Sequence, residues 1–148
     1  MAKKKKTGKT TKKDTAIRME GLTLTVDDVR RSVDFYTKKM GFKCVVNAAP
    51  HFAMIRVGGE TGGTIGLLGV KEAIKEGAKK SSAKQKRAIH VELSTDNLDE
   101  LYEELLDKGV EFHEPPHDEP WERSATAFDP DGYSVEIAQG RRGAKKKP

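Results

Sequence analysis

The chain has 148 residues, of which 35% are apolar and 34% are charged, and its formal net charge is +5. This length is typical of one domain. No stretch approaches 18 consecutive apolar residues and no apolar segment follows Met1, so we expect neither a membrane-spanning helix nor a secretory signal. The single cysteine, Cys44, excludes an internal disulfide bond and a cysteine-rich zinc site, which makes the cytoplasm the expected location.

The charge is distributed unevenly along the chain. Residues 1–13 hold seven lysines and no acid, and residues 141–148 hold five bases and no acid, so both are expected to be disordered basic tails. Residues 88–140 hold two bases and fifteen acids. The high isoelectric point therefore comes from the tails and a basic linker at 71–87, and it is not by itself evidence for nucleic-acid binding. We expect the folded domain to occupy residues 14–140.

The first half of this domain shows one helix among several strands. Alternation over Ile17–Val26 predicts a first strand. Asp27 or Asp28 is expected to cap a helix that runs to about Lys39, and Gly41 is expected to end it in the left-handed conformation. Three further strands are predicted at 42–47, 51–57 and 64–69.

The same order of elements restarts after a lysine-rich linker over residues 71–87, in which one or two helical turns are expected near Glu72–Glu76. The pattern predicts a strand, then a helix capped by Thr95 or Asp96 and ended by Gly109, and then three more strands. These elements are expected at 88–94, 95–108, 110–113, 124–128 and 133–138, with a proline-broken polar loop at 114–120 and a turn at 129–132.

The order βαβββ therefore occurs twice, as module one (residues 17–70) and module two (residues 88–139). This repeat predicts an α+β fold of tandem βαβββ modules. Each module is expected to form a small four-stranded sheet with its helix on one face. Side by side, the two sheets are expected to make a curved eight-stranded mixed sheet, with the helices outside and an open concave cup.

Strand alternation selects the side chains that face this cup. The positions expected to pack on the helix of module two are Ile89, Val91, Leu93, Val135 and Ile137. His90, Glu92 and Glu136 then face the cup, as does Arg56 in module one. Because this face is so polar, it suits a ligand-binding site better than a hydrophobic core.

The chain resembles the vicinal-oxygen-chelate superfamily, which includes glyoxalase I, bleomycin-resistance proteins, fosfomycin-resistance enzymes, extradiol dioxygenases and methylmalonyl-CoA epimerase. The resemblance spans about residues 17–139. The segments that carry it are Leu22–Val29, Ser32–Tyr36, Met40–Phe42, Ile89–Leu93 and Asp129–Glu136.

In the metal-binding members, the resemblance implies ligands in the first, fourth, fifth and eighth strands. These positions fall on Gly21, Gly66, His90 and Glu136. A catalytic zinc or iron site normally has three protein ligands, and only two are supplied here. We therefore expect no tightly bound metal and no other cofactor, although a divalent metal remains the alternative. A histidine in place of Gly21 is expected to raise metal affinity.

His90 and Glu136 are candidate catalytic residues, with Glu136 orienting the imidazole and His90 acting as a base or a hydrogen-bond anchor. The alternative is a structural, hydrogen-bonded pair. Arg56 is a candidate anion anchor or a surface charge, and Trp121 is a candidate ligand lid or a packing residue at the rim. Glu92 faces the same way as His90 and is a further ligand-binding candidate.

Three functions remain open at this point. The first is a dimeric protein of the bleomycin-resistance type that binds a small organic ligand without a tightly bound metal, and its acidic second half suits a cation. The second is a divalent-metal-dependent lyase, isomerase or dioxygenase whose site is completed by substrate. The third is a dimeric interaction protein whose basic tails bind nucleic acid or an acidic partner.

Overall fold

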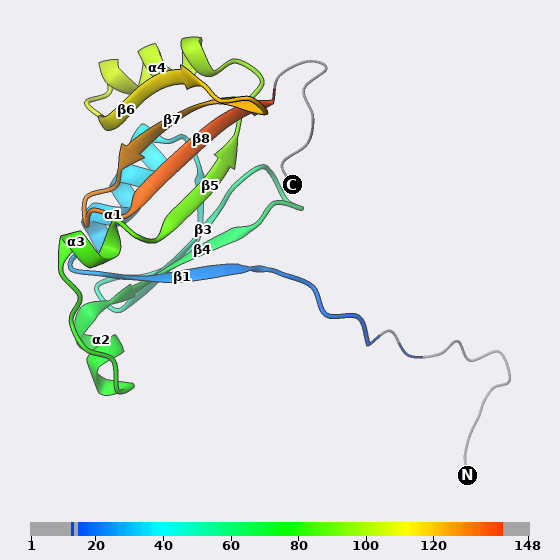
Figure 1. Cartoon of the computed structure of the whole chain (residues 1–148). Coiled ribbons are helices and arrows are strands. Elements are labelled where there is room, and N and C mark those ends of the chain that lie inside the picture. Colours follow the sequence, from blue (N-terminus) through cyan, green and yellow to red (C-terminus); the bar gives the residue numbers. More distant parts are fainter. Residues whose placement is uncertain (1–12, 14, 141–148) are drawn as a thin grey trace, which may run out of the picture.

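A computed structural model describes Lys13 and residues 15–140, so the predicted basic tails lie outside the described residues except for Lys13. Its strands and helices follow the predicted order (Figure 1). Module one contains β1 (Gly21–Val26), α1 (Val29–Asp34), the π-helical segment η1 (Phe35–Lys39), β2 (Lys43–Ala48), β3 (Phe52–Arg56) and β4 (Thr64–Gly69). The connecting segment contains α2 (Val70–Lys75) and α3 (Ala83–Lys86). Module two contains β5 (His90–Ser94), α4 (Leu98–Asp107), β6 (Glu111–Asp118), β7 (Glu122–Phe128) and β8 (Ser134–Gly140). No helix in the described part of the chain is long and apolar enough to cross a membrane.

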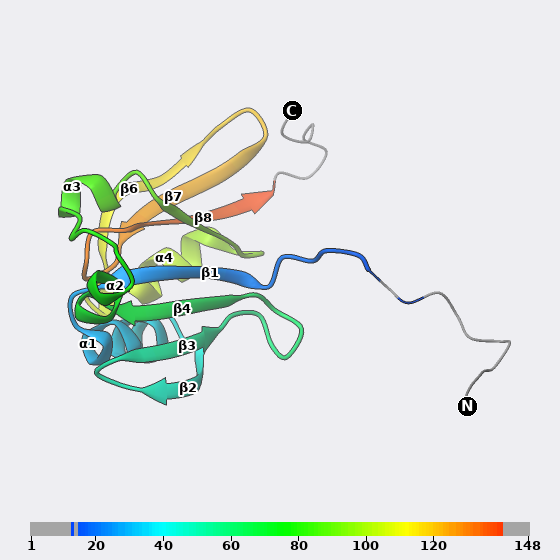
Figure 2. The same ribbon diagram turned by 90° about the horizontal axis from the view of Figure 1, so that it is seen from below.

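The eight strands form two four-stranded sheets, in the order β1-β4-β3-β2 and β5-β8-β7-β6. In each sheet the first and last strands of the module are parallel, and the other neighbours are antiparallel. The predicted α+β fold of two βαβββ modules is confirmed. Among the described residues no strand pairing joins the edge strands β1 and β5, so the eight strands are two mixed sheets rather than one continuous sheet (Figure 2).

One hydrophobic core unites the two modules. It contains apolar side chains from the helix-facing positions of both sheets, such as Ile55 and Leu67 in module one and Val135 and Ile137 in module two. Helix α1 packs on β3 and β4, and α4 packs on β6, β7 and β8. Viewed as in Figure 2, both helices lie beyond the strands, which leaves the opposite face of each sheet free of α1 and α4.

The first helix begins and ends as its sequence predicts. Asp28 is its N-cap and accepts a hydrogen bond from the backbone N–H of Arg31 at 3.1 Å. The helix continues through η1, and Gly41 follows with φ +79°, the left-handed conformation that favours glycine. The strand predicted to begin at Ile17 begins only at Gly21, because β4, its one neighbour, starts opposite that residue.

Two expectations for module two are wrong. The N-cap of α4 is Asn97 rather than Thr95 or Asp96, and its side-chain oxygen accepts from the backbone N–H of Glu100. The predicted polar loop at 114–120 is mostly strand, because β6 runs to Asp118. Proline is tolerated there since β6 is an edge strand with shifted register, so that some of its N–H groups need no partner.

The helical turns expected in the linker near Glu72–Glu76 are confirmed as α2, and a second helix, α3, was not expected. Helix α3 begins with a capping box between Ser82 and Gln85, a local signal that the lysine-rich composition obscures. Lys86, the last residue of α3, is only 3% exposed. Its Nζ lies 3.1 Å from Oδ1 of Asp131 in module two and 3.6 Å from Oδ1 of Asp27 in module one. Through these ion pairs of Lys86, the linker connects module one to module two.

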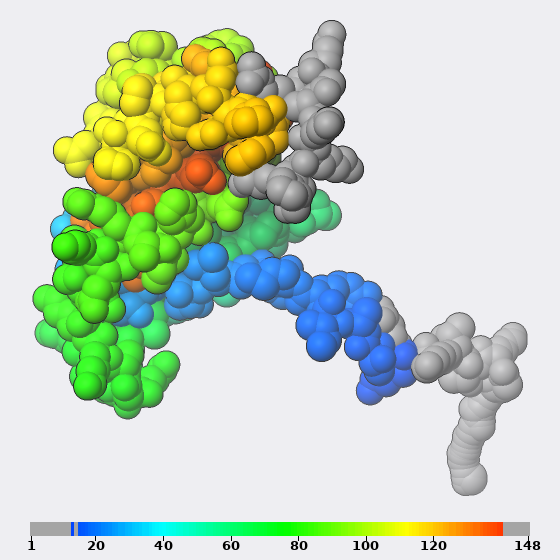
Figure 3. Space-filling model, in the orientation of Figure 1, coloured from blue at the N-terminus to red at the C-terminus, as the bar shows by residue number. Residues whose placement is uncertain are grey.

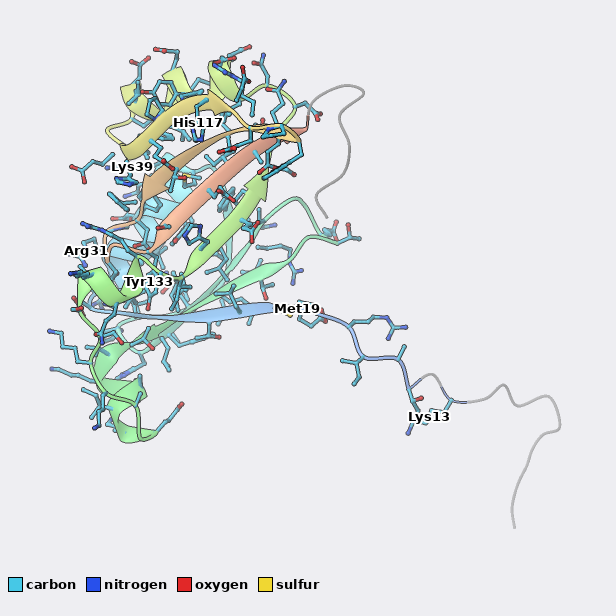
Figure 4. All side chains as sticks on the ribbon, viewed as in Figure 1. Lys13, Met19, Arg31, Lys39, His117 and Tyr133 are labelled. Carbon is cyan, nitrogen blue, oxygen red and sulfur yellow. The ribbon has the colours of Figure 1, made fainter. Side chains whose placement is uncertain are left out.

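Buried polar groups around the β7–β8 turn complete this connection. Tyr36 donates its hydroxyl to Oδ2 of Asp129 at 2.9 Å, and Tyr133 donates its hydroxyl to the carbonyl of Thr25 at 2.7 Å. The backbone N–H of Asp27 donates to Oδ1 of Asp131 at 2.8 Å. Figure 4 shows Tyr133 and Arg31 at this same end of the molecule, whereas Met19 lies on the segment that leads away from it.

This arrangement predicts a loss of stability at alkaline pH. Burial, with the nearby carboxylates of Asp131 and Asp129, raises the pKa of Tyr133 from 10.0 to about 12. Because the folded pKa lies above the unfolded one, the stabilisation is complete below pH 10 and is lost as the pH rises through 12. We expect the free energy of unfolding to fall by about 2–3 kcal/mol over this interval from Tyr133. Burial and Asp129 also raise the pKa of Tyr36, which adds to the loss.

Urea unfolding at pH 9, 10 and 11.5 measures this dependence. Tyr133→Phe is expected to be less stable at pH 9 by about 1 kcal/mol, because it lacks the hydrogen bond to Thr25, and to lose less stability above pH 10. Equal slopes for the variant and the natural protein would contradict the assignment.

Candidate functional site

The helix-free face of the second sheet, here the module-two face, is a regular grid of side chains. Side chains paired across the strands form three rows on this face. Successive rows are two residues apart along each strand, which is about 7 Å. The first row is His90, Ser134, Phe128 and Glu111; the second is Glu92, Glu136, Thr126 and Glu114; the third is Ser94, Ala138, Ser124 and His117. In the space-filling view of Figure 3, the red-orange atoms of β8 are visible between those of β5 and β6.

The opposite face of this sheet supplies core residues, as alternation predicts. Val91, Val135 and Ile137 are buried, and Leu93 packs against the same core. Ile89 differs from the prediction, because it precedes β5 and is 46% exposed.

His90 and Glu136 lie on neighbouring parallel strands, one row apart on the module-two face. In the described part of the chain no hydrogen bond joins their side chains. Glu92 is directly opposite Glu136. The structure thus brings three of the predicted site residues together on one surface.

The second row concentrates negative charge. Glu92, Glu136 and Glu114 occupy it, and the hydroxyl of Thr126 donates to Oε1 of Glu114 at 3.5 Å. Among the described residues none of these carboxylates has a basic partner within ion-pair distance. A sheet face that carries unpaired carboxylates attracts cations.

Arg56 and Trp121 lie elsewhere. Arg56 ends β3 on the other sheet, where its Nη1 donates to the carbonyls of Glu60 and Gly62 and so holds the β3–β4 turn. It also lines a hollow of about 460 Å³ with Lys43. Trp121 precedes β7 and is seven residues from Phe128, roughly 23 Å along the strand from the first row. Within one chain the structure does not bring either residue to His90.

The two glycines at implied ligand positions do not leave room for a side chain. A Cβ on Gly21 would collide with the backbone carbonyl oxygen of Thr64 on the neighbouring strand. A Cβ on Gly66 would lie 2.6 Å from Oγ1 of Thr23 and 3.3 Å from the ring of Phe52. The expectation that a histidine at position 21 would complete a metal site stays a prediction, and it requires β1 to move away from β4.

The donor set does not fit a three-ligand metal centre. Across the described residues, no group of three or more histidine, cysteine, aspartate or glutamate side chains is placed to hold a metal ion. His90 and Glu136 offer two donors, and a Cβ at Gly21 would collide with the backbone of β4.

Strand alternation did not predict the cation–π and aromatic contacts of Phe128 at the end of the face. The guanidinium carbon of Arg87 lies 4.7 Å from the ring centroid of Phe128, a first-row residue. The ring of His113 lies 5.2 Å from the same centroid, at 35°. A register shift between Phe112 and Glu114 accompanies the placement of His113 on this face. Arg87 could not be found by alternation, since it precedes β5.

A second hollow lies between the modules. It has a volume of about 780 Å³ and lies between α1 and η1 on one side and the turns of module two on the other. Arg31 and Lys39, labelled in Figure 4, are among its lining residues. It includes none of the predicted site residues.

Comparison with known proteins agrees with this architecture. The profile of the Glyoxalase/Bleomycin resistance protein/Dioxygenase superfamily matches residues 18–137. The chain belongs to this superfamily. None of the curated proteins compared with the chain matches its sequence.

Solved structures of other superfamily members are similar in fold. A glyoxalase/bleomycin resistance protein/dioxygenase from Nocardioides is 25% identical, with a TM-score of 0.70 over 91% of this chain and 91% of that one. A superfamily member from Sphaerobacter thermophilus is also 25% identical, with a TM-score of 0.66 over 84% of this chain and 98% of that one. TnmS3, an antibiotic binding protein from Streptomyces, is 20% identical, with a TM-score of 0.68 over 87% of this chain and 100% of that one. At that identity, the likeness to TnmS3 shows the fold alone.

Proposed function

We propose that this superfamily member binds a small organic cation on the module-two face, without a tightly bound metal ion. The observation that carries the proposal is the second row, where Glu92, Glu136 and Glu114 share one surface and lack basic partners among the described residues. An ammonium or amidinium group between Glu92 and Glu136 would neutralise charges on strands about 4.8 Å apart.

Neighbouring groups suit the body of such a ligand. In the first row the imidazole of His90 and the phenyl ring of Phe128 lie on either side of Ser134, which is buried and donates its hydroxyl to the carbonyl of Arg87. His90 would act as a hydrogen-bond anchor at one end of the ligand. Binding alone breaks no covalent bond, so sequestration needs none of the missing metal ligands. The antibiotic-binding activity named for TnmS3 is consistent with this kind of function.

A homodimer would enclose the ligand. The helix-free face of module one carries the apolar side chains of Phe52, Met54 and Leu68, with Arg56 at one end. We propose that this face of one copy lies opposite the acidic module-two face of its partner, which combines an apolar wall with complementary charge. Arg56 and Trp121 would then reach the rim of the site from different subunits.

A second candidate function is a metal-dependent lyase, isomerase or dioxygenase. The presence of His90 and Glu136 at two implied ligand positions favours it, with substrate as the remaining ligand. The third candidate, binding of nucleic acid or an acidic partner through the tails, concerns residues outside those described.

Calorimetric titration with benzylamine, a simple aromatic cation, tests the proposal. Replacing Glu92 and Glu136 by glutamine together is expected to weaken binding about tenfold or more, because each change removes a negative charge without a change in size. Glu104→Gln is the matched control, since this exposed residue is on α4 and away from the face, and its binding constant is expected to be unchanged.

Equal affinities for the natural protein and the double variant would place the cation elsewhere. One zinc, nickel, manganese or iron per chain in the purified protein, lost in His90→Ala, would favour the metal-dependent candidate instead.

A further inference from the structure

We propose that Arg87 is an anion-binding residue of the same face, so that the preferred ligand carries a negative group as well as a positive one. This inference rests on the proposed function, because the module-two face would hold both groups. The observations that support it are the fixed position of Arg87, its place over the ring of Phe128 and its separation from the carboxylates of Glu92 and Glu136.

The backbone of Arg87 is held firmly beside the first row. Its N–H donates to the carbonyl of Ala83 at 3.0 Å, and its own carbonyl accepts the hydroxyl of Ser134 at 2.8 Å. The preceding residue, Lys86, is buried and ion-paired with Asp131 at 3.1 Å. An arginine anchored in this way loses little further backbone freedom when it binds a ligand.

The guanidinium is also oriented. It lies over the ring of Phe128, with 4.7 Å between its central carbon and the ring centroid. The ring lies on one side of the guanidinium, and the N–H groups of a guanidinium match the two oxygens of a carboxylate or phosphonate. In the described part of the chain the side chain of Arg87 has no hydrogen bond and no ion pair.

The face therefore presents opposite charges that do not neutralise each other. Arg87 stands at the first row, over Phe128, and Glu92 and Glu136 stand in the second row, about 7 Å farther along the strands. An ion pair needs 4 Å or less between nitrogen and oxygen, and neither glutamate forms one with Arg87. A ligand can satisfy both ends at once.

The ligand class follows from this spacing. It is a small amphoteric molecule with a carboxylate, sulfonate or phosphonate at one end and an ammonium or amidinium about 7 Å away. A flat body between the two charges would run along the strands, from the first row to the second.

Three probes that differ only in charged groups test the inference: 4-(aminomethyl)benzoate, benzylamine and benzoate. The benzene ring of the first probe holds its two charges at a similar separation. We expect the natural protein to bind it about tenfold more tightly than benzylamine, because it alone engages both Arg87 and the glutamates. In Arg87→Met this advantage is expected to vanish while benzylamine affinity stays the same.

Two further variants complete the design. Arg87→Lys keeps the charge but not the planar fork, so we expect it to recover only part of the advantage. Lys84→Met is the matched control, because Lys84 is an exposed residue of α3, the short helix that Arg87 caps, and it is expected to change nothing. Circular dichroism of each variant checks that the fold is intact.

The outcomes separate the inference from the function on which it rests. If benzylamine binds and 4-(aminomethyl)benzoate binds no better, the role of Arg87 is wrong and the cation site stands. If benzoate binds through Arg87 and benzylamine does not bind, the cation site is wrong and the anion site stands. If no probe binds, both proposals are wrong. Equal weakening of all three probes in Arg87→Met would show a structural role and overturn the inference.

Discussion

Replacing Lys86 by alanine is expected to lower the free energy of unfolding by about 3–5 kcal/mol. Lys86 is almost fully buried, and its Nζ lies 3.1 Å from the carboxylate of Asp131, whose side chain has no exposed surface. The truncation would leave that carboxylate inside the protein without its closest cation. Arg31, at 3.6 Å and half exposed, compensates only in part. The change in the urea midpoint measures the loss.

Lys84→Ala is the matched control for this change. Lys84 is on the same short helix but exposed, so its truncation is expected to alter stability by less than about 0.5 kcal/mol. Lys86→Met keeps the buried hydrocarbon stem and removes only the charge, so most of the loss is expected to persist in it. A loss below about 1 kcal/mol in Lys86→Ala would show that Asp131 is satisfied by its remaining donors.

Replacing Asp129 by alanine is expected to cost about 3–5 kcal/mol as well, for a different reason. This buried carboxylate accepts the hydroxyl of Tyr36 at 2.9 Å and the backbone N–H groups of Asp131 and Tyr133 at 2.9 and 3.0 Å. Burial raises the pKa of Asp129, and the three hydrogen bonds that it accepts act in the opposite direction. Alanine would leave three buried donors without their acceptor.

Two milder variants dissect this effect. Asp129→Asn retains one carbonyl oxygen for the two backbone N–H groups, and Tyr36→Phe removes only the hydroxyl donor, so each is expected to lose less than half as much. Thermal unfolding at constant pH gives the ranking. An Asp129→Ala protein that melts within a degree or two of the natural one would mean that water replaces the carboxylate.

Local signals explain why the strands and the first helix could be predicted closely. The bounds of β4 agree with the prediction, and Gly41 and Gly109 both have the expected positive φ, +79° and +81°. Alternation and helix stops depend on neighbouring residues only. The length of β6 was missed because a partner strand and a register shift, neither of them local, allow Pro115 and Pro116 within it.

The sequence by itself determined the two βαβββ modules and the surface on which His90, Glu92 and Glu136 lie together, because a strand turns alternate side chains to opposite faces. Only the tertiary structure decided which charges meet across the modules. Lys86 pairs with a carboxylate 45 residues away, and Arg87 stacks on a ring at the end of β7. Only the pairing of β1 with β4 closes the space at Gly21. Such contacts depend on where separate strands and turns pack in space, which no periodicity within one segment encodes.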